Sequence, residues 1–352
     1  MQSPRIRAAV IGATGTVGQR LVRRLLDHPW FELAALAGSP RSAGRAYGDA
    51  VHWLLPTPLP EAVAGAEVVG LDEVEGCEVA FSALDAATAR SVEPRLAALG
   101  LAVVSNASAL RMRPDVPLVV PEVNPEHLAL LDRQDLGPGL VVTNPNCATV
   151  GLVLSLKPLI DAFGVEAVQV TTLQAISGAG HPGVPSLDIL GNALPLIPGE
   201  EAKLESEPQK ILGRVDGAAV APAGFAVSAQ ANRVPVLDGH LLSVSVRAGR
   251  RVQPEEAAEA IRAFRSPVAH LGLPTAPERP LELFDDGPRP QPRLDAGRGG
   301  GMTVTVGRLR RCPALDLRYV ALVHNTERGA AGAAVLNGEL LVATGRLVRG
   351  RA

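Results

Sequence analysis

A glycine-rich turn between an apolar run and a helical pattern is the feature that most constrains the fold of this chain. Residues 6–11 read IRAAVI, residues 12–18 read GATGTVG, and apolar side chains recur with helical spacing over residues 16–27. A buried strand, a tight glycine turn and a helix, in this order, are typical of a dinucleotide-binding βαβ unit. The glycines allow close backbone approach to a pyrophosphate, and the helix directs its first N–H groups toward the phosphates. The spacing is GxxGxxG rather than GxGxxG, so a glycine-rich turn without a ligand is the alternative.

Strands and helices continue to alternate through the first half of the chain. Further strand-like runs occupy residues 32–38, 66–70, 78–84, 101–105, 117–120 and 139–143. A helical stretch at 86–99 lies between two of them. This alternation predicts an α/β fold with a Rossmann-type, doubly wound parallel sheet.

The pattern changes after a helix that we predict from Asn146 and Cys147 to about Phe163. Longer strand-like runs then follow, separated by loops, at residues 165–176, 225–236, 240–248, 302–309 and 317–323. They predict a second α+β domain with a mostly antiparallel sheet. A proline-rich segment at 266–293 is predicted as a loop, and the alanine-rich residues 328–345 as a helix.

The length of 352 residues favours two domains. We expect a dinucleotide-binding domain of residues 1–146 joined by residues 328–352, and a catalytic and dimerisation domain of residues 147–327. The junction between the two then falls at Cys147.

Composition excludes several classes of protein. A formal net charge of −2 argues against binding to nucleic acid or to a membrane surface. The three cysteines are odd in number and far apart, which fits neither a disulfide framework nor a zinc site, and we expect no metal. No stretch of ~18 uncharged apolar residues and no signal-like segment is present, so we expect a cytoplasmic location.

The segment after the second predicted strand favours one cofactor over another. NAD sites usually place an Asp or Glu there, which binds the ribose 2′-hydroxyl. Here residues 38–44 read GSPRSAG, and the Ser39 hydroxyl and Arg41 guanidinium suit a 2′-phosphate. The segment therefore predicts NADP, with an exposed loop arginine as the alternative.

A candidate nucleophile lies at the start of the predicted helix, in the sequence TNPNCAT at residues 143–149. The positive end of a helix lowers the pKa of a thiol, and its free N–H groups can receive an oxyanion. A cysteine in this position is more often simply a small buried side chain. To act as a nucleophile, Cys147 needs a neighbouring group that transfers its proton. His240 after NRVPVLDG and His181 within SGAGHPG are both candidates for that partner, and the residues alone do not choose between them.

Ten segments spread over nearly the whole chain point to one family. They are GATGTVGQR at 12–20, SPRSAGR at 39–45, SNASALRM at 105–112, VPLVVPEVNPEH at 116–127, TNPNCAT at 143–149, LQAISGAGHPGVPS at 173–186, PGEEAKLESEPQKILG at 198–213, NRVPVLDGH at 232–240, PQPRLD at 290–295 and HNTERGAAGA at 324–333. Together they resemble the aspartate-semialdehyde dehydrogenases of the archaeal and fungal branch. The resemblance implies NADPH-dependent reduction of 4-aspartyl phosphate to aspartate 4-semialdehyde through a cysteine thioester, in lysine, threonine and methionine biosynthesis.

The resemblance also implies roles for single residues. Cys147 corresponds to the nucleophile and His240 to the acid/base group. The implied substrate and phosphate contacts are Arg111, Asn146, Gln174, Glu200, Lys203 and Arg233. The implied cofactor contacts are Gly12, Thr14, Gly15, Thr16, Val17, Ser39, Arg41, Ser42, Ser177, Gly178 and Asn325. The partners implied are small molecules and further copies of the chain, in a homodimer or homotetramer formed through the second domain.

The chemistry of these side chains agrees with the implied roles. Arg111 and Lys203 supply charge opposite an acyl phosphate, and Arg233 suits a carboxylate that binds through both oxygens. Glu200 suits the substrate ammonium group. The alternative for Glu200 and Lys203 is an exposed salt bridge between residues three apart, which would contribute little.

Two other functions compete with this reading. A reductase of CoA thioesters, such as malonyl-CoA reductase, shares the framework, as N-acetyl-glutamyl-phosphate reductase does more distantly. Glu200 favours a substrate with an ammonium group, and Lys203 favours a phosphate site. A non-catalytic NADP-binding sensor would not need Cys147, His240 and Arg233 together. One departure from the family pattern is His181, where we expect tyrosine.

Overall fold

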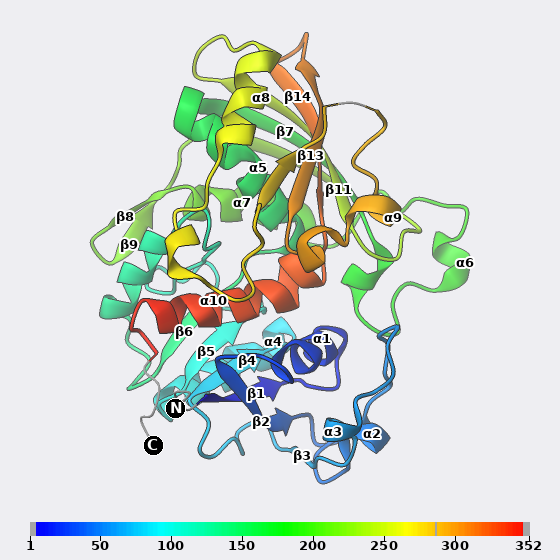
Figure 1. Cartoon of the computed structure of the whole chain (residues 1–352), viewed down its shortest axis with the longest axis vertical. Helices are drawn as coiled ribbons and strands as arrows, with labels where there is room; N and C mark the ends of the chain where they lie inside the picture. Colours follow the sequence, from blue (N-terminus) through cyan, green and yellow to red (C-terminus); the bar gives the residue numbers. More distant parts are fainter. Residues whose placement is uncertain (1–4, 286, 348–352) are drawn as a thin grey trace.

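Two six-stranded sheets organise the chain, one in each half of the molecule (Figure 1). The computed structural model describes residues 5–285 and 287–347. The sheet from the first part of the chain lies below in Figure 1, the second sheet lies above, and helix α10 (Gly332–Ala343) crosses between them. Within the described residues, no helix combines the length and apolar character needed to cross a bilayer.

The first sheet is parallel throughout, with the strand order β3-β2-β1-β4-β5-β6. Its strands are β1 (Ile6–Ile11), β2 (Phe31–Ala37), β3 (Val68–Val69), β4 (Val79–Ser82), β5 (Ala102–Ser105) and β6 (Leu140–Thr143). The order reverses between β1 and β4, as in a doubly wound dinucleotide-binding fold, and the predicted Rossmann-type sheet is confirmed. Since all strands run the same way, their carboxyl ends meet at one edge.

One strand predicted for this sheet is wrong. Residues 117–120 make only an isolated bridge, between Leu118 and Thr143. The Val119 N–H and the Pro117 carbonyl bond to the backbone of Thr143, but the chain turns after Val120. The Asn124 side chain holds this turn, because Oδ1 accepts from the Val120 N–H and Nδ2 donates to the Leu118 carbonyl, each at 2.9 Å.

Helices cover the first sheet on both faces. They include α1 (Thr16–Leu25) and α4 (Ala86–Ala98). Helix α10 returns from the second half and buries Ala334, Leu336 and Leu340 in the same core as β1 and β4. The predicted C-terminal helix is present, and a π-helical turn, Glu327–Ala331, precedes it.

The second sheet is mixed, with the strand order β10-β7-β11-β14-β13-β12. Its strands are β7 (Val165–Gln174), β10 (Ala226–Arg233), β11 (His240–Ala248), β12 (Leu281–Leu283), β13 (Val304–Arg311) and β14 (Leu317–Val323). The central pairs are antiparallel, as predicted, whereas both edge pairs are parallel. Strand β12 lies inside the proline-rich segment that was predicted as loop, because pairing with β13 orders it.

One face of the second sheet is covered and the other is open. Helices α5 (Cys147–Phe163), α7 (Glu200–Ile211) and α8 (Pro254–Ala263) share a core with β7, β11, β13 and β14. Side chains on the opposite face of β7, such as Gln169 and Thr171, are exposed. The remaining short elements are α2 (Tyr47–Ala50), α3 (Glu61–Ala64), α6 (Ser186–Ile189), α9 (Pro292–Asp295) and the hairpin β8 (Arg214–Asp216) with β9 (Ala219–Ala221). Helix α6 lies on an arm that projects from the body (Figure 1).

Candidate active site

The carboxyl edge of the parallel sheet gathers most of the predicted site residues. The Gly12 turn follows β1, the segment with Ser39 and Arg41 follows β2, Arg111 lies after β5, and Cys147 lies after β6. Open parallel sheets bind ligands at this edge, because the loops after successive strands converge there. The second half of the molecule adds Gln174 and other groups from the ends of β7, β10 and β11.

The turn after β1 has the geometry of a phosphate-binding loop. Gly12 has φ +81°, a conformation that favours glycine. A β-carbon on Gly18 would stand 2.1 Å from the Gly12 carbonyl oxygen, so the turn packs directly against the first turn of α1. The N–H groups of Gly12 and Ala13 both donate to the Ala37 carbonyl, which holds the turn against the end of β2.

Free donors at this turn fit a phosphate group. Helix α1 begins after Gly15 without a side chain that caps its first N–H groups. The Thr16 hydroxyl is buried and has no hydrogen-bond partner among the described residues. In the adjacent segment, Ser39 is half-buried, Arg41 is exposed and Ser42 is buried, which leaves the guanidinium free to reach a ligand. The residues present therefore fit a dinucleotide with a 2′-phosphate.

Cys147 is the first residue of α5, and His240 is the first residue of β11. The Asn146 side chain caps α5, because its Oδ1 accepts from the N–H groups of Ala148 and Thr149. Cys147 Sγ lies 3.2 Å from His240 Nε2. The Ala175 N–H donates to His240 Nδ1 at 3.0 Å, so a neutral ring carries its proton on Nε2, toward the sulfur.

The structure brings His240, rather than His181, to the cysteine. The His181 side chain is exposed and its ring packs against that of His52, with centroids 4.9 Å apart. This contact joins the two halves of the molecule, since His52 belongs to the first and His181 to the second. The other two cysteines, Cys77 and Cys312, lie elsewhere, and neither forms a disulfide bond.

The pKa of the Cys147 thiol is raised by its surroundings, whereas its position at the start of a helix predicted a lowered pKa. Burial raises the pKa of the Cys147 thiol to about 12, and Glu200 raises it further, while Arg111 and Arg233 act in the opposite direction. Burial also lowers the pKa of His240 to about 3, with Arg233 contributing. The prediction of a lowered thiol pKa is therefore wrong for the free protein, which holds a neutral thiol beside a neutral imidazole.

Glu200 lies at the centre of a polar group formed by predicted substrate contacts. Its Oε2 accepts from Asn146 Nδ2 at 2.8 Å and from Gln174 Nε2 at 3.2 Å, and its Oε1 accepts from Lys203 Nζ at 2.9 Å. Burial tends to raise the pKa of this carboxyl, but Lys203 and the hydrogen bonds outweigh it, so the pKa is lowered. Glu200 is only 8% exposed, so the pair with Lys203 is not the exposed salt bridge that was the alternative.

Arg233 and the turn after β7 complete this side of the site. Arg233 is buried and donates from Nη1 to the Ala175 carbonyl at 2.8 Å. A β-carbon on Gly178 would stand 2.9 Å from Arg233 Nη1 and 3.2 Å from His240 Cε1, so only glycine fits over these two side chains. Asn325 donates to Ser177 Oγ and accepts from the Gly239 N–H, both at 2.8 Å, which ties this turn to the start of β11.

Arg111 is held by a residue that the sequence analysis did not identify. Glu207 Oε1 accepts from Arg111 Nη1 at 2.8 Å, and Glu207 Oε2 accepts from the Asn146 N–H at 2.6 Å. Lys210 donates to the carbonyls of Arg111, Arg113 and Val116, each at 2.7 Å. A signal was present in the sequence: Glu207 and Lys210 continue the helical face that begins with Glu200 and Lys203.

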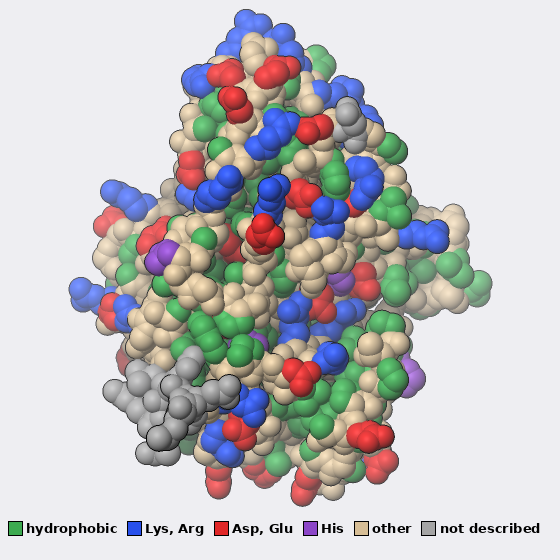
Figure 2. Space-filling model, in the orientation of Figure 1, with side chains coloured by type: hydrophobic (Ala, Val, Ile, Leu, Met, Phe, Trp, Pro, Cys, Tyr) green, Lys and Arg blue, Asp and Glu red, His purple; other side chains and the backbone are tan. Residues whose placement is uncertain are grey.

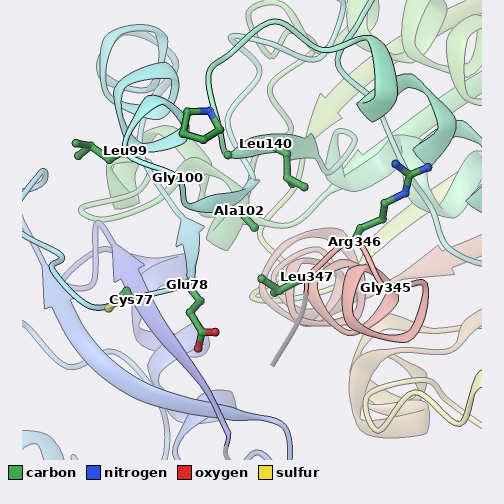
Figure 3. Close-up of a pocket in the computed structure, with 11 residues that line it drawn as sticks. Cys77, Glu78, Leu99, Gly100, Ala102, Leu140, Gly345, Arg346 and Leu347 are labelled. Carbon is green, nitrogen blue, oxygen red and sulfur yellow. The ribbon is translucent and has the colours of Figure 1, made fainter. Parts of the chain in front are cut away.

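A separate cavity lies at the opposite edge of the parallel sheet (Figure 3). It measures about 340 Å³ and is bordered by Glu78, Ala102 and Leu140, which stand at the amino ends of β4, β5 and β6. It is therefore remote from Cys147.

Acidic and basic side chains are interspersed over the face seen in Figure 2. Within residues 5–285 and 287–347, no group of three His, Cys, Asp or Glu side chains could hold a metal ion.

Comparisons with known proteins agree with this geometry. The NAD binding domain of the semialdehyde dehydrogenases matches residues 7–131, and their dimerisation domain matches residues 156–328. An aspartate-semialdehyde dehydrogenase of Methanothermobacter thermautotrophicus is 50% identical over 96% of this chain and 99% of its own length. One of Archaeoglobus fulgidus is 48% identical over 96% of this chain and 98% of its own length.

Solved structures of aspartate-semialdehyde dehydrogenases also resemble this chain. The chain resembles the aspartate semialdehyde dehydrogenase of Candida albicans, solved with NADP, with a TM-score of 0.90 and 43% identity, covering 97% of this chain and 99% of that one. It also resembles the Vibrio cholerae aspartate semialdehyde dehydrogenase II, solved with ASA, with a TM-score of 0.77 and 27% identity over 96% of this chain and 98% of that one.

Proposed function

The chain belongs to the aspartate-semialdehyde dehydrogenase family, and we propose that Cys147 and His240, with the charged groups around them, form its catalytic centre. The enzyme reduces 4-aspartyl phosphate with NADPH to aspartate 4-semialdehyde and phosphate, a step in lysine, threonine and methionine biosynthesis. The contact of 3.2 Å between Cys147 Sγ and His240 Nε2, at the start of a helix, carries the proposal.

We assign the cofactor to the carboxyl edge of the parallel sheet. The backbone and hydroxyl donors of the turn from Gly12 to Val17 hold the pyrophosphate, and Ser39, Arg41 and Ser42 hold the 2′-phosphate. Ser177, Gly178 and Asn325 border the cofactor from the second half of the molecule. When bound, NADPH supplies the hydride that reduces the thioester.

Different charged side chains bind the two ends of the substrate. Arg111, Lys203 and Asn146 bind the phosphate end, where a doubly charged leaving group needs cations and donors. Arg233 binds the substrate carboxylate, and Glu200 with Gln174 binds the ammonium group. This arrangement directs the acyl carbon between them toward Cys147.

The thiol of Cys147 loses one proton in the first half of the reaction and regains one in the second. In the first, Cys147 Sγ bonds to the acyl carbon, the bond from carbon to phosphate oxygen breaks, and the thiol proton leaves with the phosphate. In the second, reduction of the thioester returns the electron pair to sulfur, which takes up one proton as the aldehyde departs. The N–H at His240 Nε2 faces Sγ, so the ring can donate a hydrogen bond to the sulfur as negative charge develops on it, and N–H groups at the start of α5 stabilise the tetrahedral oxyanions.

Charged groups that the substrate would contact act on the Cys147 thiol in opposite directions. Glu200 contributes to the raised pKa of Cys147, and a substrate ammonium beside Glu200 offsets its negative charge. Arg111 and Arg233 already lower the pKa of the thiol. A bound substrate engages groups of both kinds, since its ammonium faces Glu200 while its phosphate and carboxylate face Arg111 and Arg233.

A kinetic assay separates this function from its rivals. NADPH formation is followed after aspartate semialdehyde, phosphate and NADP are mixed with the protein, and we expect activity that depends on phosphate. Replacement of phosphate by CoA, with malonate semialdehyde as the aldehyde, tests the thioester alternative. Turnover only in that second mixture would overturn the proposal, and cofactor binding without turnover in either would favour the non-catalytic sensor.

The second domain supports assembly of identical chains, since the matched segment is a dimerisation domain. We propose a homodimer, or a homotetramer built from it, that covers the open face of the second sheet. We further propose domains of residues 1–146 with 328–352 and of residues 147–327, of which residues 1–4, 286 and 348–352 lie outside the described residues. A cytoplasmic location suits the three unpaired cysteines.

A further inference from the structure

One face of helix α7 carries four charged side chains that converge on the site. Glu200, Lys203, Glu207 and Lys210 follow one another at intervals of three, four and three residues, which places them along a single stripe of the helix. The first two belong to the substrate group described above. The last two face the loop that carries Arg111, which lies more than ninety residues away in the sequence.

Glu207 joins two parts of the site that different strands supply. Its carboxylate is 2% exposed, and each oxygen accepts one strong hydrogen bond. One donor is the guanidinium of Arg111, from the loop after β5, and the other is the N–H of Asn146, from the turn after β6. The second bond is made one residue before the nucleophile.

Neighbouring contacts reinforce this link. Asn146 is held from two sides by α7, because its side chain donates to Glu200 and its backbone donates to Glu207. The Arg111 guanidinium also donates from Nη2 to the Asn106 carbonyl at 2.7 Å, while its buried Nε has no partner among the described residues. Glu207 therefore orients Arg111 and leaves a donor free for a ligand.

We propose that Glu207 is a positioning residue that sets the spacing between the phosphate-binding Arg111 and the nucleophile Cys147. This inference rests on the proposed function, since it takes Arg111 as the phosphate ligand. The carboxylate fixes the guanidinium on one side and the Asn146–Cys147 turn on the other. An acyl phosphate bound at Arg111 then presents its carbon to the sulfur at the distance that the reaction requires.

Glutamine at this position is a diagnostic replacement. A carboxylate offers two acceptor oxygens, and both are used here, whereas an amide of the same shape offers one acceptor and one donor. Glu207→Gln can serve either Arg111 or Asn146 and must place an N–H against the donor of the other. The variant keeps the packing but breaks the link.

The test compares Glu207→Gln with a control on the same helix, Glu205→Gln, whose exposed side chain accepts from the Ala229 N–H. We expect Glu207→Gln to raise the KM for inorganic phosphate and to lower kcat, each at least tenfold, while the KM for NADP changes less than twofold. The control should match the wild type. A purely structural role would instead lower the melting temperature and leave the KM for phosphate unchanged.

A second readout does not depend on turnover. Phosphate bound at Arg111 should slow alkylation of Cys147 by iodoacetamide, and Glu207→Gln should raise the phosphate concentration that halves the rate at least tenfold. If Glu207→Gln does not fold, Glu207→Asp carries the test, because it withdraws both oxygens by one methylene. A folded variant with wild-type protection and wild-type kcat would overturn the inference. Failure of the wild type to turn over substrate would overturn the proposed function. The protection of Cys147 by phosphate could still be measured, because alkylation does not require turnover.

Discussion

Gly329 lies against Cys147 so closely that no side chain fits between them. A β-carbon on Gly329 would stand 2.6 Å from the Cys147 β-carbon and 2.9 Å from its α-carbon. The contact is made by the π-helical turn Glu327–Ala331, which the buried ion pair between Arg328 and Glu122 anchors at 2.5 and 2.8 Å. The sulfur is therefore positioned from behind by a segment near the other end of the chain.

We expect Gly329→Ala to lower kcat by about a hundredfold, because displacement of a nucleophile by about 1 Å costs about that much. Binding of NADP, measured by fluorescence titration, should change little, since the Gly12 turn and the Ser39–Arg41 segment assigned to its phosphates are unchanged. Gly65→Ala is the matched control, because a β-carbon at Gly65 meets no atom within 4 Å. Wild-type turnover in Gly329→Ala would contradict the assigned role of this contact.

The nucleophile itself gives the simplest prediction. Cys147→Ala should abolish phosphate-dependent NADPH formation, because no thioester can form without the sulfur. NADP should still bind, since the Gly12 turn and the Ser39–Arg41 segment are unchanged. Cys312→Ala, which alters a cysteine without a disulfide and remote from the site, should retain full activity. Turnover by Cys147→Ala would refute the covalent mechanism.

Charge around the thiol makes its reactivity predictable in direction. Since Glu200 raises the pKa of Cys147, Glu200→Gln should move the pH profile of alkylation by iodoacetamide to lower pH and speed the reaction several-fold at neutral pH. Since Arg233 lowers that pKa, Arg233→Gln should move the profile to higher pH. Mass spectrometry of the Cys147 peptide gives the rates. Shifts in the same direction for both variants would contradict the electrostatic account.

Cofactor preference depends on the segment after β2. Arg41→Ala should raise the KM for NADP about tenfold or more, because a charge-assisted bond to the 2′-phosphate is lost. The KM for NAD, which lacks that phosphate, should change little. Arg45→Ala is the control, since this exposed neighbour donates instead to the Asp49 carbonyl. An equal rise for both cofactors would place the role of Arg41 outside phosphate recognition.

Local features of the sequence were sufficient to predict the elements that carry the nucleophile and the cofactor turn. The cap at Asn146 and the apolar spacing after it define α5 within a few residues, and the glycines after β1 define their own turn. Strand β12 and the segment 117–120 were predicted wrongly for one reason. Whether a short segment forms a strand depends on contacts outside the segment, with β13 in one case and with Thr143 and the Asn124 side chain in the other.

The electrostatic part of the site was less predictable than its residue list. From the sequence alone, Glu207 resembles a solvent-exposed helix residue. In the structure it is buried and accepts hydrogen bonds from Arg111 and Asn146. The thiol pKa shows the same dependence, since the helix start was visible in the sequence but the surrounding burial and the carboxylate of Glu200 were not.

Burial of His240 also makes stability depend on pH. Its pKa is about 3 in the folded protein and about 6.5 in an unfolded chain, so between these values the unfolded state binds a proton that the folded state does not. The free energy of unfolding should therefore fall as the pH is lowered through this range, and His240 alone should contribute a loss of about 2 kcal/mol between pH 7 and pH 5.

His240→Gln removes this titration while its side-chain oxygen can still accept from the Ala175 N–H. We expect the variant to lose about 2 kcal/mol less than the wild type over the same pH interval. Urea denaturation at each pH, followed by circular dichroism, measures the difference, and the other histidines cancel because both proteins share them. Parallel stability curves for the two proteins would show that His240 titrates with the same pKa in the folded and unfolded states, contrary to the lowered pKa described above.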